Sequence, residues 1–295
     1  MKIAKLIPNG PASILLAFLL WGGSCAPEKI DLNSNDSANV ENETTSDTHF
    51  ADSEDLSAVT VSSDNATNGG RIAEGVRVII VNDPRLVCAT VTLVPAGNST
   101  VKFPRGLLTI DFGTGCTDKH GNTRKGKILI SYNGRRFLPG SSVVTTLDGY
   151  EINGIKIEGV RSVTNTSNSS QADPRFTATM TGGMITWPDG TTAQRDETIT
   201  REWKLGVTSL ENQWFVTGSA TGKNRHDLEY NMTITNKLVY KKECAANKIY
   251  MPVQGTKELI VSNKKITIDY GNGTCDKLVT ITIKGKSKVV ELGNN

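Results

Sequence analysis

The sequence predicts an all-β body, an antiparallel meander of short strands, behind an N-terminal targeting segment and a polar tether. Two observations support this prediction. From residue 71 onward, Thr, Val and Ile alternate with polar residues in short runs, which fits a pleated, half-buried surface. Turn dipeptides separate the runs, and no stretch of a dozen residues has the 3.6-residue period of a capped helix. A two-layer sandwich-like body, a barrel or a long curved sheet would each satisfy this pattern.

The first 24 residues have the features of an export signal. Lys2 and Lys5 are followed by the apolar run ASILLAFLLW at 12–21, which is too short to span a bilayer stably. Small residues then lead to Cys25. This order resembles the lipobox of bacterial lipoproteins, although Gly22 stands where leucine is common. The resemblance implies a signal peptide over 1–24 and an acylated Cys25; the alternative is an ordinary secretory signal cleaved near Ser24.

The next segment is polar and acidic. Residues 26–70 consist mostly of Asn, Ser, Thr, Asp, Glu and Ala and cannot bury enough apolar surface to offset their ordering entropy. We therefore expect residues 25–70 to be a disordered tether that holds the body about 35–40 Å from its lipid. The triplet Asp-Ser-Ala at 36–38 resembles the short O-glycosylation sequon of Bacteroidota, which would place a sugar on Ser37.

The body over 71–295 is divided into about thirteen strands. The signals between them include Asn133-Gly134, Asp148-Gly149, Asn153-Gly154 and Asp189-Gly190, dipeptides that favour tight hairpin turns. The predicted strands cover residues 77–81, 88–94, 107–113, 127–134, 142–148, 150–160, 175–187, 198–205, 212–220, 229–240, 258–262, 265–271 and 278–285.

The charge of the chain is unevenly distributed. Residues 26–70 carry ten acidic side chains and one basic one, whereas residues 71–295 carry 30 Lys and Arg against 20 Asp and Glu. The tether and the body should therefore attract each other at low salt. A basic body in the envelope suggests an anionic polysaccharide or lipopolysaccharide as partner, and a merely solvated surface is the alternative.

Candidate surface residues follow from these patterns. A dense basic run at 119–127 and its continuation supply Lys125, Lys127, Arg135 and Arg136. Three tryptophans lie on segments that we expect to pair, and they could form either cross-strand packing or a carbohydrate-stacking surface: Trp187, Trp203 and Trp214. The basic runs lack the interleaved aromatics of a single-strand platform, so we do not expect nucleic acid binding.

One ten-residue motif occurs twice, as TIDFGTGCTD at 109–118 and TIDYGNGTCD at 267–276. Each copy follows an upstream cysteine, so we infer two related units at about 84–140 and 240–295. With Cys25 reserved for lipid, the repeat favours one disulfide per unit, Cys88–Cys116 and Cys244–Cys275. The other pairings and a four-cysteine metal site are the alternatives.

The acidic residues of the motif allow two interpretations. Asp111 with Asp118, and Asp269 with Asp276, could bind a cation around a glycine-rich turn. The spacing lacks the alternating acidic positions of an EF-hand loop, and glycines serve tight turns without any metal. We therefore expect a turn, no metal and no cofactor.

The acylated cysteine, the polar tether and the two DFGxGxC-type motifs together resemble uncharacterised β-rich envelope lipoproteins of Bacteroidota. The resemblance covers most of residues 84–295 and implies a lipid anchor in the outer membrane, either periplasmic or surface-exposed. It implies no activity.

Catalytic signatures are weak. No GxSxG, HExxH, P-loop or dinucleotide motif occurs, His49 lies in the tether, and His120 and His226 lie in expected turns. Glu151 and Glu158 could be proposed as a carboxylate pair, but salt bridges explain them equally. We expect a non-catalytic lipoprotein that binds an anionic or glycan envelope component. The alternatives are a structural or protein-interaction lipoprotein and, less favoured, a glycan-acting enzyme.

Overall fold

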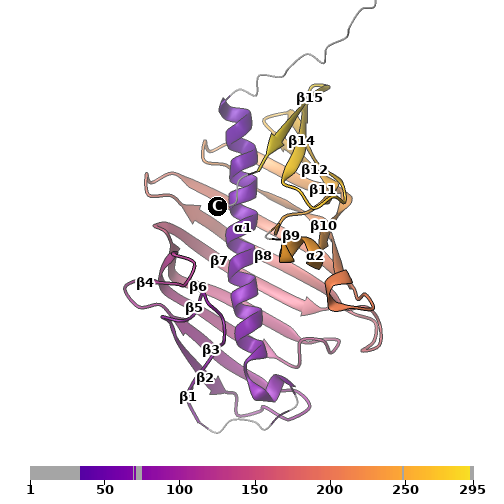
Figure 1. The fold of residues 1–295 in the computed structure, drawn as a ribbon. Coiled ribbons are helices and arrows are strands. Elements are labelled where there is room, and N and C mark those ends of the chain that lie inside the picture. Colours follow the sequence, from indigo (N-terminus) through magenta and orange to yellow (C-terminus); the bar gives the residue numbers. More distant parts are fainter. Residues whose placement is uncertain (1–33, 69, 71–74, 248, 293–295) are drawn as a thin grey trace, which may run out of the picture.

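One large antiparallel sheet and one long helix make up the fold (Figure 1). The computed structural model describes residues 34–68, 70, 75–247 and 249–292, so the signal segment and Cys25 lie outside the described residues. Helix α1 (Ser34–Ser62) crosses one face of the sheet. The strands are β1 (Arg77–Ile79), β2 (Thr90–Pro95), β3 (Arg105–Asp111), β4 (Cys116–Thr117), β5 (Thr123–Asn133), β6 (Ser142–Ile152), β7 (Ile155–Asn165), β8 (Arg175–Thr186), β9 (Thr192–Lys204), β10 (Gln213–Lys223), β11 (Glu229–Lys241), β12 (Gln254–Val261), β13 (Lys264–Asn272), β14 (Leu278–Ile283) and β15 (Lys286–Glu291).

The sheet is a meander, as predicted. Each strand pairs with the next along the chain, except that the two-residue β4 pairs only with β5, so β3 and β5 are neighbours. Every pairing is antiparallel, and β1 and β15 stand at the two ends of the strand order. The body is therefore an open sheet whose second layer is α1. Short helical turns η1 (Asn65–Asn68), η2 (Ser209–Glu211) and α2 (Lys242–Ala246) lie in connections.

Period-two alternation gives the sheet one buried face. Along β9, Ala193, Arg195, Glu197 and Ile199 are buried, and the residues between them are exposed. The buried side chains fall into two apolar clusters, one over β2–β8 and one over β8–β15. Helix α1 adds side chains to both clusters, so the helix and the sheet share one core.

Most predicted turns are confirmed, with one correction. Asn153 and Gly154 join β6 to β7 with φ angles of 52° and 81°, the left-handed pair that a tight hairpin requires. Asp148-Gly149 does not end a strand. It lies inside β6, where the pairing with β5 shifts register at a bulge.

The helix replaces part of the expected tether. We expected disorder over 25–70, whereas residues 34–62 form α1; residues 26–33 lie outside the described residues. Along one row of the helix the side chains facing the sheet recur at intervals of three and four, but polar residues separate the apolar ones, so no continuous apolar stripe marks the helix. This row includes Val40, Glu43, Asp47, Phe50, Glu54, Ser57 and Val61.

The two copies of the repeated motif share the turn at the first aspartate and differ at the second. The Asp111 carboxylate accepts a hydrogen bond from the Gly113 N–H at 2.8 Å, and the Asp269 carboxylate accepts one from Gly271 at 2.8 Å. Asp118 accepts the N–H groups of His120 and Asn122 and also pairs with Arg124. Asp276 accepts the N–H of Leu278. These carboxylates build turns, as the turn interpretation requires.

The predicted disulfide pairing is confirmed. Cys88 bonds to Cys116 with a Cα–Cα distance of 5.8 Å, and Cys244 bonds to Cys275 with one of 5.2 Å. Glu243, Cys244 and Cys275 lie close enough together to hold a metal ion, but the sulfurs of Cys244 and Cys275 are bonded to each other in the disulfide. Each bridge ties a motif cysteine to an upstream segment between strands: Cys88 lies in the β1–β2 connection and Cys244 lies in α2.

We predict that Cys116→Ser will expose a free thiol at Cys88 and leave Cys244–Cys275 closed. Losing the bridge should lower the free energy of unfolding by about 2–5 kcal/mol, because the unfolded chain regains freedom. Non-reducing peptide mapping and urea unfolding would measure both effects, with Cys275→Ser as the reciprocal control. A peptide joining Cys88 to Cys244 would contradict the assignment.

Candidate ligand-binding cleft beside helix α1

Helix α1 is held by buried ion pairs. Its carboxylates meet arginines and a lysine that point from the sheet and from the β1–β2 connection. Buried charges are costly unless they are paired and hydrogen-bonded, so each carboxylate needs its partner. The pairs fall into three clusters along the helix.

The first cluster lies near the start of α1. Glu43 pairs with Arg195 on β9 at 2.6 Å and with Lys257 on β12 at 3.2 Å. Asp47, one turn later, pairs with Arg195 at 2.9 Å and also contacts Lys257. Burial opposes ionisation, but the adjacent Arg195 and Lys257 overcome it and lower the pKa of Glu43 to about 2.

The second cluster surrounds Glu54. Its two carboxylate oxygens each lie 2.6 Å from a guanidinium, one of Arg161 on β7 and one of Arg201 on β9. Arg161 also pairs with Glu197 at 3.1 Å. Against the cost of burial, the two guanidiniums lower the pKa of Glu54 to about 2.

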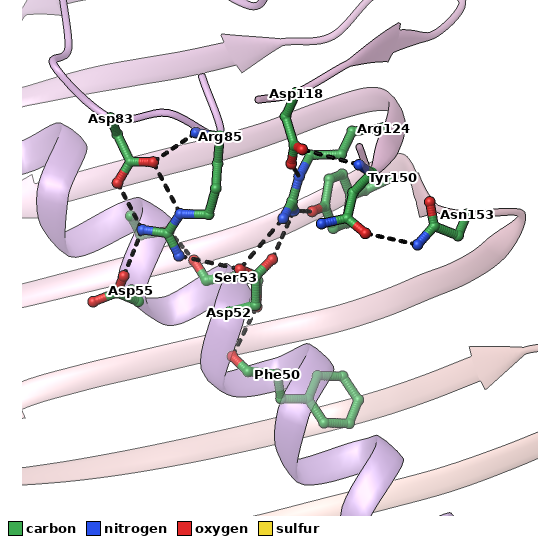
Figure 2. Close-up of polar contacts among 12 residues, drawn as sticks. Phe50, Asp52, Ser53, Asp55, Asp83, Arg85, Asp118, Arg124, Tyr150 and Asn153 are labelled. Carbon is green, nitrogen blue, oxygen red and sulfur yellow. Dashed lines mark hydrogen bonds and ion pairs between the residues drawn. The ribbon is translucent and has the colours of Figure 1, made fainter. Parts of the chain in front are cut away.

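The third cluster is centred on Arg124 (Figure 2). This arginine is 2% exposed and pairs with Asp52 at 2.6 Å and with Asp118 at 3.1 Å, and it also donates to the Tyr150 hydroxyl. Arg85 joins Asp52 to two further carboxylates, Asp55 and Asp83. Because these groups satisfy one another, we assign the three clusters to holding α1 in place.

A cleft opens beside the carboxyl-terminal half of α1. Its walls come from the helix, from the β5–β6 connection and from β6, β7 and β8, and they are mostly apolar with a few polar groups. The lining residues are Glu54, Ser57, Ala58, Val61, Gly134, Arg136, Ser141, Ser142, Val143, Thr145, Val163, Asn165 and Phe176.

Arg136 is the unusual residue of this cleft. Its guanidinium carbon lies 5.6–5.7 Å from the centres of the Phe137, Phe176 and Trp203 rings. Its backbone carbonyl is fixed by donors from Ser141 and Asn165, each at 2.9 Å. No ion pair to Arg136 is found among the described residues, and burial lowers the pKa of its guanidinium. The ring cage therefore holds a cation without a carboxylate partner.

The surroundings favour an anion at this position. Two buried donors on β9, the Nε of Arg201 and the Nε1 of Trp203, have no hydrogen-bond partner. Arg136, Arg161 and Arg201 supply three positive charges here, against the two carboxylates of Glu54 and Glu197. One positive charge therefore remains in this region of the structure.

The structure separates the three predicted tryptophans. Trp203 and Trp214 stack across β9 and β10 at 6.0 Å, and Tyr240 stacks on Trp214 at 6.0 Å. Their ring faces are turned toward one another, which is cross-strand packing rather than an open stacking surface. Trp187 lies at the opposite strand end, where the Arg225 guanidinium lies 4.3 Å from its ring centre.

The predicted basic residues do not form one patch. Lys125 pairs with Glu151 at 2.8 Å and Lys127 with Asp111 at 3.2 Å, near the start of β5. Arg135 and Arg136 follow the other end of that strand, and Arg135 donates to the Val101 carbonyl at 2.6 Å. Only Arg136 takes part in the cleft.

The histidines and the other carboxylate pair do not meet in a site. His49 lies on α1, where burial lowers its pKa, whereas His120 and His226 lie in turns. Glu158 pairs with Lys156 at 2.8 Å, so both glutamates considered for catalysis, Glu151 and Glu158, are in salt bridges.

Comparisons of the chain with protein-family models, with curated proteins and with solved structures give no match. Among the described helices, none combines the length and the apolar character needed to cross a membrane. The functional interpretation therefore rests on the chain itself.

We predict that Glu54→Gln will lower the free energy of unfolding at pH 7 by about 2–4 kcal/mol, because Arg161 and Arg201 lose a buried partner. The pKa of Glu54 falls from its ordinary 4.5 to about 2 on folding. The ionised Glu54 therefore contributes fully to the free energy of unfolding above about pH 5, and this contribution is lost as the pH falls toward 2. The difference in free energy of unfolding between the wild type and Glu54→Gln, measured by urea titration, should shrink as the pH is lowered over this range.

Glu243→Gln is the matched control, because Glu243 is exposed and pairs only at 3.4 Å with Lys241. It should change stability by less than about 0.5 kcal/mol. A wild-type-like pH profile in Glu54→Gln would contradict the role assigned to Glu54.

Proposed function

We propose that this chain is a lipid-anchored, non-catalytic binding protein of the cell envelope whose ligand carries an anionic group. The observation that carries the proposal is Arg136, a cation caged by three aromatic rings in a cleft and without a carboxylate partner among the described residues. A carboxylate or phosphate in the cleft could pair with this guanidinium through charge-assisted hydrogen bonds.

The apolar walls of the cleft add selectivity. Val61, Val143, Val163 and Phe176 line it beside Arg136. A small inorganic anion would leave these walls uncovered, whereas an acidic sugar or a lipopolysaccharide fragment presents both a charged group and carbon-bound hydrogens. The proposal therefore favours an anionic glycan component of the envelope over a free ion.

The charge balance changes the role of the basic body. Much of its positive charge is neutralised inside the fold by carboxylates of α1, which pair with Arg124, Arg161, Arg195, Arg201 and Lys257. The surface of the body therefore attracts polyanions less strongly than its net charge suggests. Binding of an anionic ligand then depends more on a local site such as the Arg136 cleft. The anchor rests on the lipobox resemblance at Cys25.

One observation favours a second candidate, a protein-interaction lipoprotein. Strand β1 is an open edge of the sheet; its Val78 side chain is 67% exposed, and that of Ile80, which directly follows the strand, is 93% exposed. Such an edge can accept a strand from a partner protein.

We predict that Cys25→Ala will move the protein from the membrane fraction to the soluble fraction, because the acyl chains would be lost. Detergent-phase partitioning and mass measurement of the N-terminal peptide would test this. The control is Cys116→Ser, which removes a different cysteine and should leave the protein in the membrane. Membrane retention of Cys25→Ala would contradict the anchor.

We also predict that Arg136→Gln will weaken binding of an acidic ligand by about tenfold or more, the scale of a lost charge-assisted hydrogen bond. Calorimetric titration of the folded protein with lipopolysaccharide and with a soluble polyuronate, at low and at physiological salt, would measure it. Arg175→Gln is the matched control, because Arg175 is exposed and pairs with Glu202 on the surface. Equal loss in both variants, or no binding of either probe, would contradict the proposal and leave the β1 edge as the stronger candidate.

A further inference from the structure

Lys257 is a buried amine that the proposed function does not use. It lies on β12, and its side chain is 3% exposed. Its Nζ atom contacts the carboxylate of Asp47 on α1 and lies 3.2 Å from the Oε1 atom of Glu43, one turn earlier on the helix. The amine therefore meets two carboxylates at close range, although Asp47 lies 210 positions earlier in the chain.

The Asp47 carboxylate is held between two cations. Its Oδ1 atom accepts a hydrogen bond from Arg195 at 2.9 Å, and its Oδ2 atom contacts Lys257. The Arg195 side chain is 2% exposed, and its Nη1 atom lies 2.6 Å from the Oε2 atom of Glu43. One oxygen of Asp47 is thus fixed by a guanidinium, and the other lies against the amine.

These contacts supply the groups that amide formation requires. Holding an amine against a carboxyl group raises its effective concentration to about 10⁵ M or more in well-oriented intramolecular reactions. A guanidinium on the carboxyl oxygen stabilises the negative charge of a tetrahedral intermediate, and a second carboxylate beside the amine can carry a proton. Arg195 occupies the first of these positions and Glu43 occupies the second.

We propose that Lys257 and Asp47 condense to an isopeptide bond once α1 has docked on the sheet, with release of one water molecule. One proton of the ammonium passes to the Asp47 carboxylate, and the Nζ atom then attacks the carboxyl carbon. Glu43 takes a second proton from the nitrogen and returns it to the departing hydroxyl. Water leaves, Glu43 is regenerated, and the product is a neutral amide that needs no oxidant, reductant or cofactor.

The charges of the cluster favour a slow reaction. Burial raises the pKa of Asp47, so this carboxyl can accept a proton. Against burial, which disfavours the charged form, Asp47 raises the pKa of Lys257 well above its usual value, so the amine starts as an ammonium. Lys257 is also one of the two cations that hold the pKa of Glu43 low, and Glu43 becomes a better proton acceptor as that charge is lost. We therefore expect the bond to form after folding rather than during it.

The bond changes how α1 is held. Two buried charges are replaced by an amide, which carries no net charge to desolvate. Arg195 keeps Glu43 and Glu197 as partners, each at 2.6 Å, so the remaining guanidinium stays neutralised. The helix is then joined covalently to β12, and ion pairing is no longer its only attachment at this cluster.

Tryptic mapping of the reduced and alkylated full chain tests the bond directly. Trypsin does not cleave after a lysine whose Nζ atom is acylated. We therefore expect residues 30–71 to be joined to residues 249–264, with a mass equal to the sum of the two peptides less one water. Fragmentation spectra should place the branch at Asp47 and Lys257. A branch at Glu43, or complete cleavage after an unmodified Lys257, would overturn the proposal and leave a buried ion pair.

Glu43→Gln tests the proton transfer. We expect the linked fraction, compared at matched times after synthesis, to fall by at least about tenfold, because a positioned proton-transfer group contributes about 10²-fold or more to such a step. Closure of both disulfides shows whether the variant has folded. Linkage equal to wild type in folded Glu43→Gln would overturn the step as written, and the wild-type map decides the bond itself even if the variant does not fold.

The matched control is a second lysine–carboxylate contact in the same digest. Lys265 also contacts Glu258, but the Lys265 side chain is 63% exposed, so water competes for both groups. This pair should give no linked peptide. Equal linkage of the two pairs would overturn the proposal, because sample handling would then explain both. The inference uses neither the anchor nor the cleft, so its failure would leave the proposed function standing.

Discussion

Pairing between the carboxylates of α1 and the cations of the sheet is the constraint on which the fold depends. Arg124, Arg161, Arg195 and Lys257 point from the buried face of the sheet, where unpaired charges would be prohibitively costly. The helix neutralises them and adds apolar side chains to both clusters of the core. Its position also creates the cleft, because the helix forms one wall and Arg136 lies on the other.

The strands and disulfides could be predicted because their signals are local. Alternation of Thr, Val and Ile marks a half-buried strand wherever it occurs, and the duplicated motif placed Cys116 and Cys275 in equivalent turns. Helix α1 gave no such signal. Glu43, Asp47 and Glu54 occupy positions that an amphipathic helix fills with apolar residues, and they can be buried only because their cationic partners lie 107 to 214 residues further along the chain.

The candidate site was predictable in composition but not in geometry. Arg136 belongs to a basic run that is conspicuous in the sequence. Its role as a caged cation depends on the rings of Phe176 and Trp203, which come from β8 and β9. Lys125 and Lys127 looked equivalent to it and are neutralised by a carboxylate on a neighbouring strand. Strand register decides between these outcomes, and register is set by the whole meander rather than by any single segment.

The distance along the chain between α1 and its partners also dictates an order of events during folding. The pair Glu43–Lys257 joins residues 214 positions apart, so the part of α1 around Glu43 can complete its ion pairs only after β12 has formed. Until then its carboxylates must remain hydrated, and a helix this polar has little reason to form alone. Docking of α1 is therefore expected to be a late, slow step that only a complete chain can take, and a chain truncated before β12 would lack part of the surface that receives the helix.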